Sequence, residues 1–157
     1  MYKRQALVAT VGKLAVHPNA SNVIPGAVQV SLDVRAARDS IRETAVTELL
    51  HQAQAIATRR GLKLESKRLM DHPAVPMDEQ LTALLALAVE AAGHPARRMP
   101  SGAGHDAMVL GTRLPSAMLF LRSPGGISHH PDESVLEPDV EAALQASLLF
   151  LRQLTRM

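Results

Sequence analysis

The chain alternates apolar and polar residues most clearly over Val28-Gln29-Val30-Ser31-Leu32-Asp33-Val34-Arg35. On an extended backbone the four apolar side chains point to one side and the four polar ones to the other. The stretch therefore predicts a strand with one buried and one solvated face. The turn formers of residues 17–26 separate it from an earlier apolar run at residues 6–16. We expect two strands joined by a loop.

A helix and a further strand are expected after this pair. Residues 39–59 repeat apolar side chains at helical spacing, Asp39 can cap the first turn, and Gly61 suits a left-handed end. Residues 62–67 alternate again and predict a last strand. The order strand, strand, helix, strand is half or more of a split, ferredoxin-like βαβ layer. Its helix would cover the face that carries Val28 to Val34.

The second half of the chain has a different pattern. Residues 71–76 contain two prolines and are the best candidate for a linker. Helices are expected at 78–92, 106–110 and 138–154, with Asp78 as a cap and Gly93 as a stop. Strands are expected at 97–99 and over the continuous apolar run Ala117-Met118-Leu119-Phe120-Leu121, as for a strand buried on both faces. This alternation predicts an α/β layer. The last helix should direct four residues inward: Val140, Leu144, Leu148 and Leu151.

Length and composition exclude several classes of protein. The 157 residues suffice for one ordinary domain or two small ones, and 46% apolar with 20% charged residues is typical of a folded globular chain. There is no cysteine, so disulfides, thiolate zinc sites and cysteine nucleophiles are excluded. No apolar run is long enough for a transmembrane helix, and the polar start is unlike a secretory signal, so we expect a cytoplasmic protein.

The charge is unevenly divided. Residues 1–72 carry a net charge of +5 and residues 73–157 one of −3. The basic residues of the first half are spread over the expected strands and helix instead of one stripe, and aromatic residues are only 2% of the chain. Two domains with different solvated surfaces explain this better than nucleic-acid binding, which we do not expect.

One loop, residues 125–133, is a candidate metal-ligand group. It contains His129, His130, Asp132 and Glu133, side chains that bind zinc, manganese, cobalt or nickel. Adjacent histidines point in different directions, so the loop offers one ligand or two, whereas a site needs three or four. A metal-binding loop and a solvated histidine-rich loop both remain open, and the loop alone favours the second.

Two further clusters could bind a substrate. In Gly102-Ala103-Gly104-His105-Asp106 the glycines allow close approach to a ligand, and His105 could orient it or move a proton. The alternative is an N-cap aspartate after a tight turn, which the cluster alone favours. Arg35 offers a planar fork for a carboxylate, and Asn22, thirteen residues earlier, could meet it on one sheet edge. The alternative is a surface arginine beside Asp33.

Together these motifs resemble the C-terminal part of the hydantoinase/carbamoylase-type amidases. This group includes allantoate amidohydrolases, N-carbamoyl-L-amino acid hydrolases and β-ureidopropionases, within the aminoacylase-like metallopeptidase superfamily. The resemblance covers residues 6–154. It rests on five stretches: Thr10-Val11-Gly12, His17-Pro18-Asn19-Ala20-Ser21-Asn22-Val23-Ile24-Pro25-Gly26, Leu32-Asp33-Val34-Arg35, Pro100-Ser101-Gly102-Ala103-Gly104-His105-Asp106-Ala107 and Gly125-Gly126-Ile127-Ser128-His129-His130-Pro131-Asp132-Glu133.

The resemblance implies a domain organisation. Residues 1–72 would be the second half of a ferredoxin-like lid and dimerisation domain. Residues 73–157 would be the C-terminal portion of an α/β, di-metal aminopeptidase-like catalytic domain. It further implies a homodimer formed through the lid, and metal-assisted hydrolysis in which two divalent ions activate a water, a carboxylate takes its proton and the lid closes over the substrate.

The resemblance also implies roles in metal binding and in substrate binding. His129 would be the metal ligand from the C-terminal loop, with Glu133 as its support. The metals would be zinc or manganese, with cobalt or nickel possible. Asn22 and Arg35 would grip the substrate carboxylate, usually in the partner subunit's site, and Gly104 would line the pocket. His105 and Asp106 match the family pattern without an assigned role.

The family's other ligands are an upstream His-x-Asp pair, a Glu-Glu pair that includes the general base and a further histidine. We expect none of them in this chain, and neither a His-x-Asp nor a Glu-Glu motif anywhere in it. We therefore expect a C-terminal fragment without a catalytic residue, unable to retain two metals and nearly inactive alone. The resemblance favours allantoate as the parent's substrate, a small ureido anion. An N-carbamoyl-L-amino acid or a β-ureido acid is the alternative. A non-catalytic dimerisation or binding module is the alternative of another class.

Overall fold

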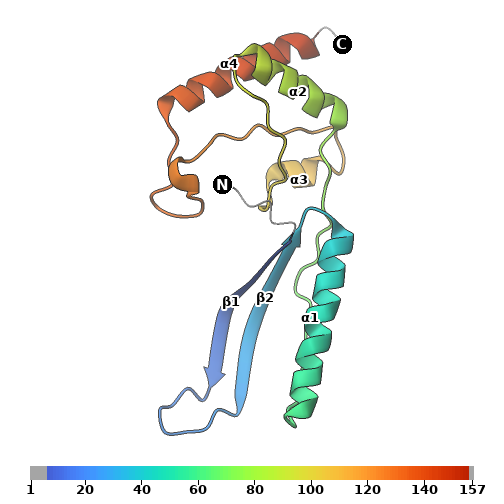
Figure 1. Cartoon of the computed structure of the whole chain (residues 1–157), viewed down its shortest axis with the longest axis vertical. Helices are drawn as coiled ribbons and strands as arrows, with labels where there is room; N and C mark the ends of the chain where they lie inside the picture. The colour runs from blue at the N-terminus through green and yellow to red at the C-terminus, as the bar shows by residue number, and fades with distance from the viewer. Residues whose placement is uncertain (1–6, 156–157) are drawn as a thin grey trace. The chain divides into compact units, whose positions relative to one another are not determined.

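The computed structural model describes residues 7–155, which divide into two compact units. The first unit runs as far as Ala74 and includes the short segment Pro100–Gly102. The second unit holds Val75–Met99 and the chain from Ala103 onward. Figure 1 shows the order of the elements along the chain. The mixed α/β class expected from the sequence is confirmed.

The first unit is built on an antiparallel hairpin. Strand β1 (Leu7–His17) pairs with strand β2 (Ala27–Ala36), from Leu7 opposite Ala36 to His17 opposite Ala27. The register shifts between Thr10 and Lys13, where the Lys13 N–H donates to the Ser31 hydroxyl at 2.9 Å. Both expected strands are therefore present.

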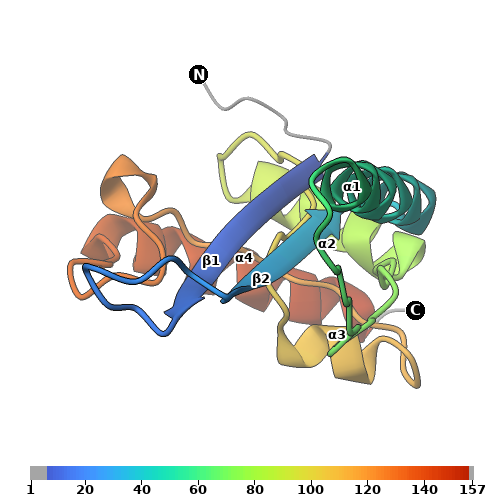
Figure 2. The ribbon, with the colours of Figure 1, turned by 90° about the horizontal axis from the view of Figure 1, so that it is seen from below.

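Helix α1 (Asp39–Arg59) follows the hairpin and lies on its β2 side (Figure 2). It ends as predicted at Gly61, which has a φ of 63°. The N–H of Leu62 donates to the Ala57 carbonyl at 2.8 Å, the closing bond of a Schellman motif. Its start differs from the prediction, because Arg38 is the N-cap and Asp39 is the first helical residue.

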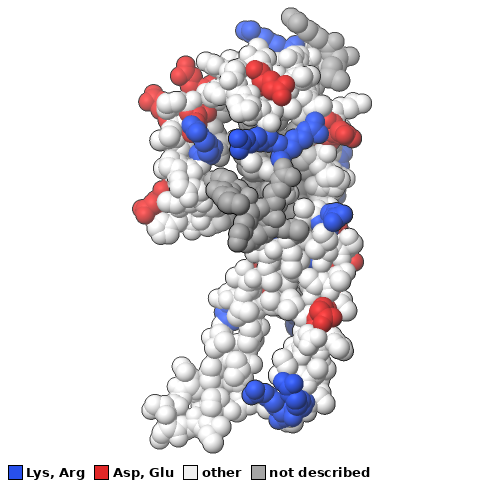
Figure 3. Space-filling model, in the orientation of Figure 1, with Lys and Arg blue, Asp and Glu red and all other residues white. Residues whose placement is uncertain are grey.

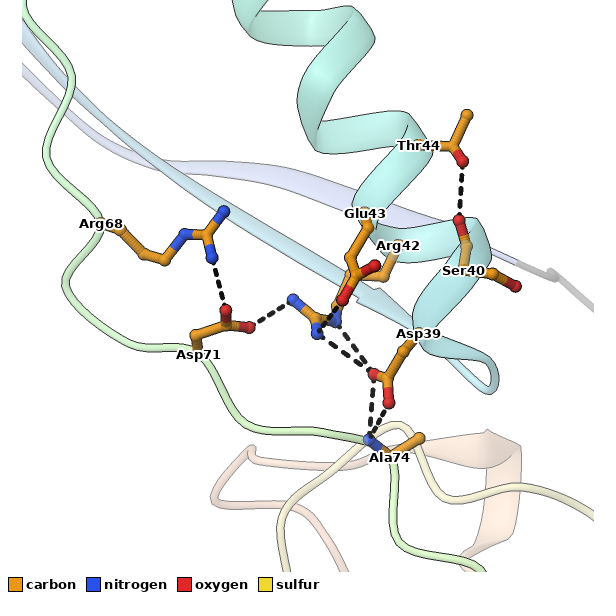
Figure 4. Close-up of polar contacts among 8 residues, drawn as sticks. All are labelled: Asp39, Ser40, Arg42, Glu43, Thr44, Arg68, Asp71 and Ala74. Carbon is orange, nitrogen blue, oxygen red and sulfur yellow. Dashed lines mark hydrogen bonds and ion pairs between the residues drawn. The ribbon is translucent and has the colours of Figure 1, made fainter.

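The carboxylate of Asp39 serves a tertiary contact instead of a cap. Both of its oxygens accept the N–H of Ala74, at 3.1 and 3.2 Å. The guanidinium of Arg42 bridges Asp39 at 3.1 Å and Asp71 at 2.6 Å, and Arg68 pairs with the other oxygen of Asp71 (Figure 4). The Arg42 side chain is only 16% exposed. This group, the Arg42 clasp, fixes the segment 68–74 to the first turn of α1.

The third strand expected at residues 62–67 is absent, because nothing in the described part of the chain forms a ladder with this segment. The apolar face of β2 is likewise only partly covered, since Val28 is 56% exposed and Val30 and Leu32 are exposed too. A two-stranded ribbon beside one helix is too narrow to bury that face. The ferredoxin-like layer is thus represented by strand, strand and helix.

The second unit contains helix α2 (Glu79–Ala91), helix α3 (Asp106–Leu110), a 3₁₀ turn at Pro124–Gly126 and helix α4 (Glu137–Leu154). The predicted start of α2 is confirmed, as Asp78 accepts the N–H of Leu81 at 2.8 Å. Its predicted end is confirmed by Gly93, with a φ of 86°. The Asp78 N–H also donates to the Ser116 carbonyl at 2.8 Å, which ties the start of α2 to the loop after α3.

Helices α2 and α4 pack through alanine. Ala88 and Ala146 are buried, whereas Leu144, Leu148 and Leu151 are exposed, the first by 60%. The prediction that these three leucines face inward is wrong, because the small residues on another face of α4 allow the closer approach to α2. Val140 is half-buried. The leucine stripe is left as an open apolar surface.

The two strands expected in the second unit are also not formed. Residues 97–99 and 117–121 belong to no ladder. Between residues 117 and 122, no backbone group hydrogen-bonds to another backbone group of the described chain. Strands need neighbours, and among residues 7–155 only β1 and β2 find them.

Much apolar surface consequently stays open. The accessible surface is 13,058 Å², whereas a folded protein of this mass exposes about 7,700 Å². The buried apolar residues found in the described chain are three alanines, Ala57, Ala88 and Ala146. None of the helices described here combines the length and the apolar character needed to cross a bilayer.

The Arg42 clasp should loosen in acid. Arg42 lowers the pKa of Asp71 below its ordinary value of 3.8, so the clasp is complete above that value and is lost as the pH falls through the lower, folded pKa. We expect hydrogen exchange of residues 68–75, corrected for intrinsic rates, to rise in that window. Asp71→Asn should show the fast exchange already at neutral pH, whereas Glu65→Gln, outside the clasp, should not. Unchanged exchange in Asp71→Asn would contradict this role.

Gly111 is required by close packing. A Cβ there would lie 2.8 Å from the Ala107 carbonyl oxygen and 3.1 Å from Val75 Cγ1. Gly111→Ala should therefore destabilise the second unit by about 1–3 kcal/mol, measured as a lower thermal midpoint by circular dichroism. Gly104→Ala is the matched control, since its Cβ would meet Met108 Cε at an ordinary 3.7 Å. Equal midpoints for the two variants would refute the packing argument.

Candidate functional site

Arg35 is held at the end of β2 by a carboxylate two residues earlier. Side chains at this spacing share one face of a strand. Arg35 Nε donates to Asp33 Oδ1 at 2.7 Å, and Nη2 donates to Oδ2 at 3.0 Å. The third nitrogen, Nη1, donates to the Gly102 carbonyl at 2.9 Å. The ion pair lowers the pKa of Asp33 and raises that of Arg35, so both groups stay charged.

This arrangement fixes the guanidinium and leaves it able to bind more. A guanidinium has five N–H donors. Contacts with the described residues use one donor on each nitrogen, which leaves one on Nη1 and one on Nη2. The side chain is 54% exposed. Arg35 can therefore still donate two hydrogen bonds to a carboxylate.

Asn22 does not meet Arg35. It lies in the loop between β1 and β2, at the start of β2, whereas Arg35 lies near its end. Eight residues of extended chain separate Ala27 from Arg35, a distance of about 26 Å. The prediction that the two residues share one sheet edge is wrong, because the strand between them is continuous. In one copy of the chain they cannot hold the same small anion.

The glycine-rich cluster leads into α3. His105 is the N-cap, with extended backbone, and Asp106 is the first helical residue, so the prediction of an N-cap aspartate is wrong. The His105 ring contacts Phe120 edge to face, with centroids 5.8 Å apart. Gly104 has ordinary space around its Cβ position. Nothing in the described fold therefore demands glycine at 104, and its role in lining a pocket stays a prediction.

The histidine loop is folded by its own backbone. Gly125 and Gly126 have φ values of 71° and 68°, and His129 has a φ of 58°, a left-handed conformation that is strained for histidine. The His129 N–H donates to Glu133 Oε2 at 2.8 Å. Glu133 thus supports the backbone of His129 in this structure, not its ring.

A metal centre cannot be completed from these residues. The expectation that the chain contains no His-x-Asp motif is wrong, because the loop contains His130-Pro131-Asp132. The two side chains interact with each other: His130 Nδ1 accepts the Asp132 N–H at 3.2 Å and lies 3.5 Å from its carboxylate. No group of three or more His, Asp or Glu residues within 7–155 is placed to hold an ion. The residues present do not fit a two-metal site by themselves.

Two partners of the candidate residues were missed in the sequence: the Gly102 carbonyl for Arg35 and Phe120 for His105. Both contacts join residues on different segments of the chain, so no local sequence pattern predicts them. The Asp33–Arg35 ion pair could have been predicted from the sequence. Side chains two residues apart on a strand lie on the same face, about 7 Å apart, and these two have opposite charges. That pattern favours the alternative of a surface arginine beside Asp33.

The sequence matches a model of a known protein family. The model described as "Peptidase family M20/M25/M40" matches residues 5–153. The chain belongs to this family. The M20 match spans both units and includes Asn22, Arg35, Gly104 and His129.

Curated relatives are similar over almost the whole chain. "Allantoate deiminase 2" of Glycine max is 40% identical, over 96% of this chain and 33% of its own length. "N-carbamoyl-L-amino acid amidohydrolase" of Geobacillus stearothermophilus is 34% identical, over 91% of this chain and 34% of its own length. The M20 chain thus spans about a third of the length of the curated relatives that it matches.

Solved structures share the fold. An amidase of the hydantoinase/carbamoylase family from Burkholderia multivorans is 33% identical, with a TM-score of 0.86 over 93% of this chain and 36% of that one. A structure described as AtUAH in complex with (S)-hydroxyglycine is 28% identical, with a TM-score of 0.84 over 97% of this chain and 36% of that one. The resemblance to the C-terminal part of these amidases is confirmed.

The chain alone should not retain metal. Since the described residues offer His129 without two further ligands, we expect less than one equivalent of manganese or zinc after equilibration and dialysis, measured by elemental analysis. His129→Ala should not change the result. Two equivalents that disappear in His129→Ala would contradict the incomplete site.

Proposed function

We propose that this chain is part of an amidohydrolase that cleaves the C–N bond of a linear ureido compound, with allantoate as the substrate. The observation that carries the proposal is the guanidinium of Arg35, fixed by Asp33 and the Gly102 carbonyl with two N–H donors to spare. A ureido acid presents a carboxylate that such a fork binds. The 40% identity to a soybean allantoate deiminase supports the choice of substrate.

The other candidate residues take complementary roles in the proposal. Asn22 binds the same substrate class but from another copy of the chain, because it lies too far from Arg35 in its own copy. Gly104 lines the pocket, and His105 and Asp106 support it at the start of α3. The carboxylate in (S)-hydroxyglycine, named for the AtUAH structure, is the group expected at Arg35.

Divalent metal is part of the proposal only for a complete enzyme. His129 would supply one ligand, and Glu133 would hold its backbone, as the 2.8 Å bond to the His129 N–H supports. Because the described residues contain no ligand set, the remaining ligands and the general base must come from outside them. The candidate ions are zinc, manganese, cobalt and nickel, and this choice rests only on the preference of these ions for imidazole and carboxylate ligands.

The two units are proposed to serve different domains. Residues 1–72 would belong to the lid and dimerisation domain, and residues 73–157 to the catalytic domain; the division into compact units after Ala74 supports this. Residues 14–32 contain no charged side chain, and the far part of the hairpin is white in Figure 3, while basic side chains gather at the end of α1. With Ile24 91% exposed, this hairpin surface suits contact with a second copy.

A cysteine-free chain is compatible with the proposed cytoplasmic location.

Two alternatives have support of their own. An N-carbamoyl-L-amino acid also joins a carboxylate to a ureido group, and the relative from Geobacillus stearothermophilus is 34% identical. A β-ureido acid has the same groups. A non-catalytic dimerisation module is favoured by the large open apolar surface. Substrate preference distinguishes hydrolysis of N-carbamoyl-L-amino acids or β-ureido acids from hydrolysis of allantoate. Any hydrolytic activity in a complete enzyme distinguishes these three functions from a non-catalytic module.

A chimaera tests the function. This chain should be grafted in place of the matching third of the soybean deiminase, and ammonia release from allantoate measured with manganese. We expect turnover, and lower turnover of N-carbamoyl-L-amino acids. Arg35→Lys should raise KM for allantoate about tenfold or more, because lysine lacks the planar fork. Arg38→Lys, at the exposed N-cap of α1, is the matched control and should leave KM unchanged. A folded chimaera without activity on any ureido acid would reject the proposal.

A further inference from the structure

Arg122 and Asp139 form an ion pair across the two ends of the loop that carries His129. Arg122 Nε donates to Oδ1 and to Oδ2 of Asp139, each at 2.9 Å, and Nη2 donates to Oδ1 at 2.7 Å. The two residues are 17 positions apart, and both belong to the second unit. Because two nitrogens contact one carboxylate, the orientation of the guanidinium is fixed as well as its distance. The pair therefore closes the base of loop 123–136.

The hydrogen bonds of this loop are local. Two turns close with the N–H groups of Gly126 and Glu133, each of which donates at 2.9 Å to the carbonyl three residues earlier. The His129 N–H donates to the Glu133 carboxylate at 2.8 Å. In the part of the chain that the structure describes, no hydrogen bond joins residues 124–135 to the chain outside the loop. These bonds fold the loop, whereas the ion pair at its base holds its two ends together.

Asp139 anchors the pair on a packed helix. It lies in the first turn of α4, which is held against α2 through the buried Ala88 and Ala146. The Asp139 side chain is 13% exposed, against 76% for Arg122. The Arg122 guanidinium holds the pKa of Asp139 below its ordinary value of 3.8, and His94 adds to this effect. The carboxylate is therefore ionised at neutral pH, where the arginine is charged as well.

We propose that Arg122 and Asp139 are positioning residues for His129: their ion pair holds the ends of loop 123–136 together and so sets the position of the imidazole. The proposal rests on the proposed function for the part that His129 takes in the reaction, but the ordering of the loop does not depend on it. A carboxylate in the first turn also stabilises a helix through its dipole, which is the competing explanation of Asp139. Glu137 lies in the same turn outside the ion pair and distinguishes the two explanations.

Backbone order parameters from nitrogen-15 relaxation of the full chain test the ordering of the loop. For residues 127–135 we expect values of about 0.85 in the wild-type chain and below about 0.6 in Arg122→Gln and in Asp139→Asn. Glu137→Gln is the matched control, because it removes the same charge from the same turn but leaves the pair intact, and it should keep the wild-type values. The double variant should be no more mobile than either single variant, since both remove one interaction.

The exposed Arg122 makes this test independent of folding. Its side chain is 76% exposed, so Arg122→Gln leaves the packing of the second unit unchanged, and this variant decides the matter if Asp139→Asn fails to fold. Arg122→Lys keeps the charge without the planar fork and should give intermediate order parameters. Helix content, measured by circular dichroism, should be the same in each arginine variant as in the wild-type chain.

The chimaera with the soybean deiminase tests the effect of the loop on the reaction. Arg122→Gln should lower kcat for allantoate at least tenfold and change KM less than threefold, because the carboxylate-binding Arg35 lies in the first unit and is untouched. Glu137→Gln should leave both constants unchanged. A chimaera that is inactive before any substitution rejects the proposed function, and the order parameters of the chain alone then still decide whether the ion pair orders the loop.

Three results would overturn the proposal. The first is an Arg122→Gln loop with the order parameters of the wild-type chain. The second is an equal loss of order in Glu137→Gln, which would assign the effect to the helix dipole. The third is a mobile loop in Arg122→Gln together with an unchanged kcat in an active chimaera, because the order of the loop would then have no bearing on His129.

Discussion

Extended backbone needs hydrogen-bonding partners along its edges, and this constraint accounts for most of what the chain does and does not form. Where two apolar stretches are linked by a short loop, β1 and β2 supply each other's partners, and a hairpin results. Residues 62–67 alternate apolar and polar side chains and residues 117–121 are apolar throughout, yet both lack a strand ladder in the described chain. The difference lies in the available neighbours and not in local propensity.

The same reasoning separates what could be predicted from what could not. The strand over Val28 to Val34, the cap at Asp78 and the left-handed glycines Gly61 and Gly93 follow from local patterns, and the structure confirms them. The buried face expected for that strand is not confirmed, because Val28, Val30 and Leu32 are exposed. Whether an apolar face is covered depends on distant chain, so the inward orientation of Leu144 was predicted wrongly. The caps expected at Asp39 and Asp106 were displaced by one residue, since Arg38 and His105 take those places.

For the site, sequence motifs found the loops but not their geometry. The spacing of Asn22 and Arg35 could have excluded their meeting, because an unbroken strand of this length holds its ends far apart. In contrast, no motif could have shown that Asp33 and the Gly102 carbonyl fix the guanidinium, because the second contact spans 67 residues. The M20 match shows the family, which no single loop could show.

The distribution of functional groups follows from this dependence on neighbours. Arg35 is oriented entirely within its own unit, through bonds of 2.7, 2.9 and 3.0 Å to Asp33 and the Gly102 carbonyl. His129 has its backbone held by Glu133, whereas its imidazole has no ligand set around it in the described chain. In the proposed function, recognition of the anion would therefore be organised locally. The proposed metal site would need ligands from outside the described residues, because these offer no group of three.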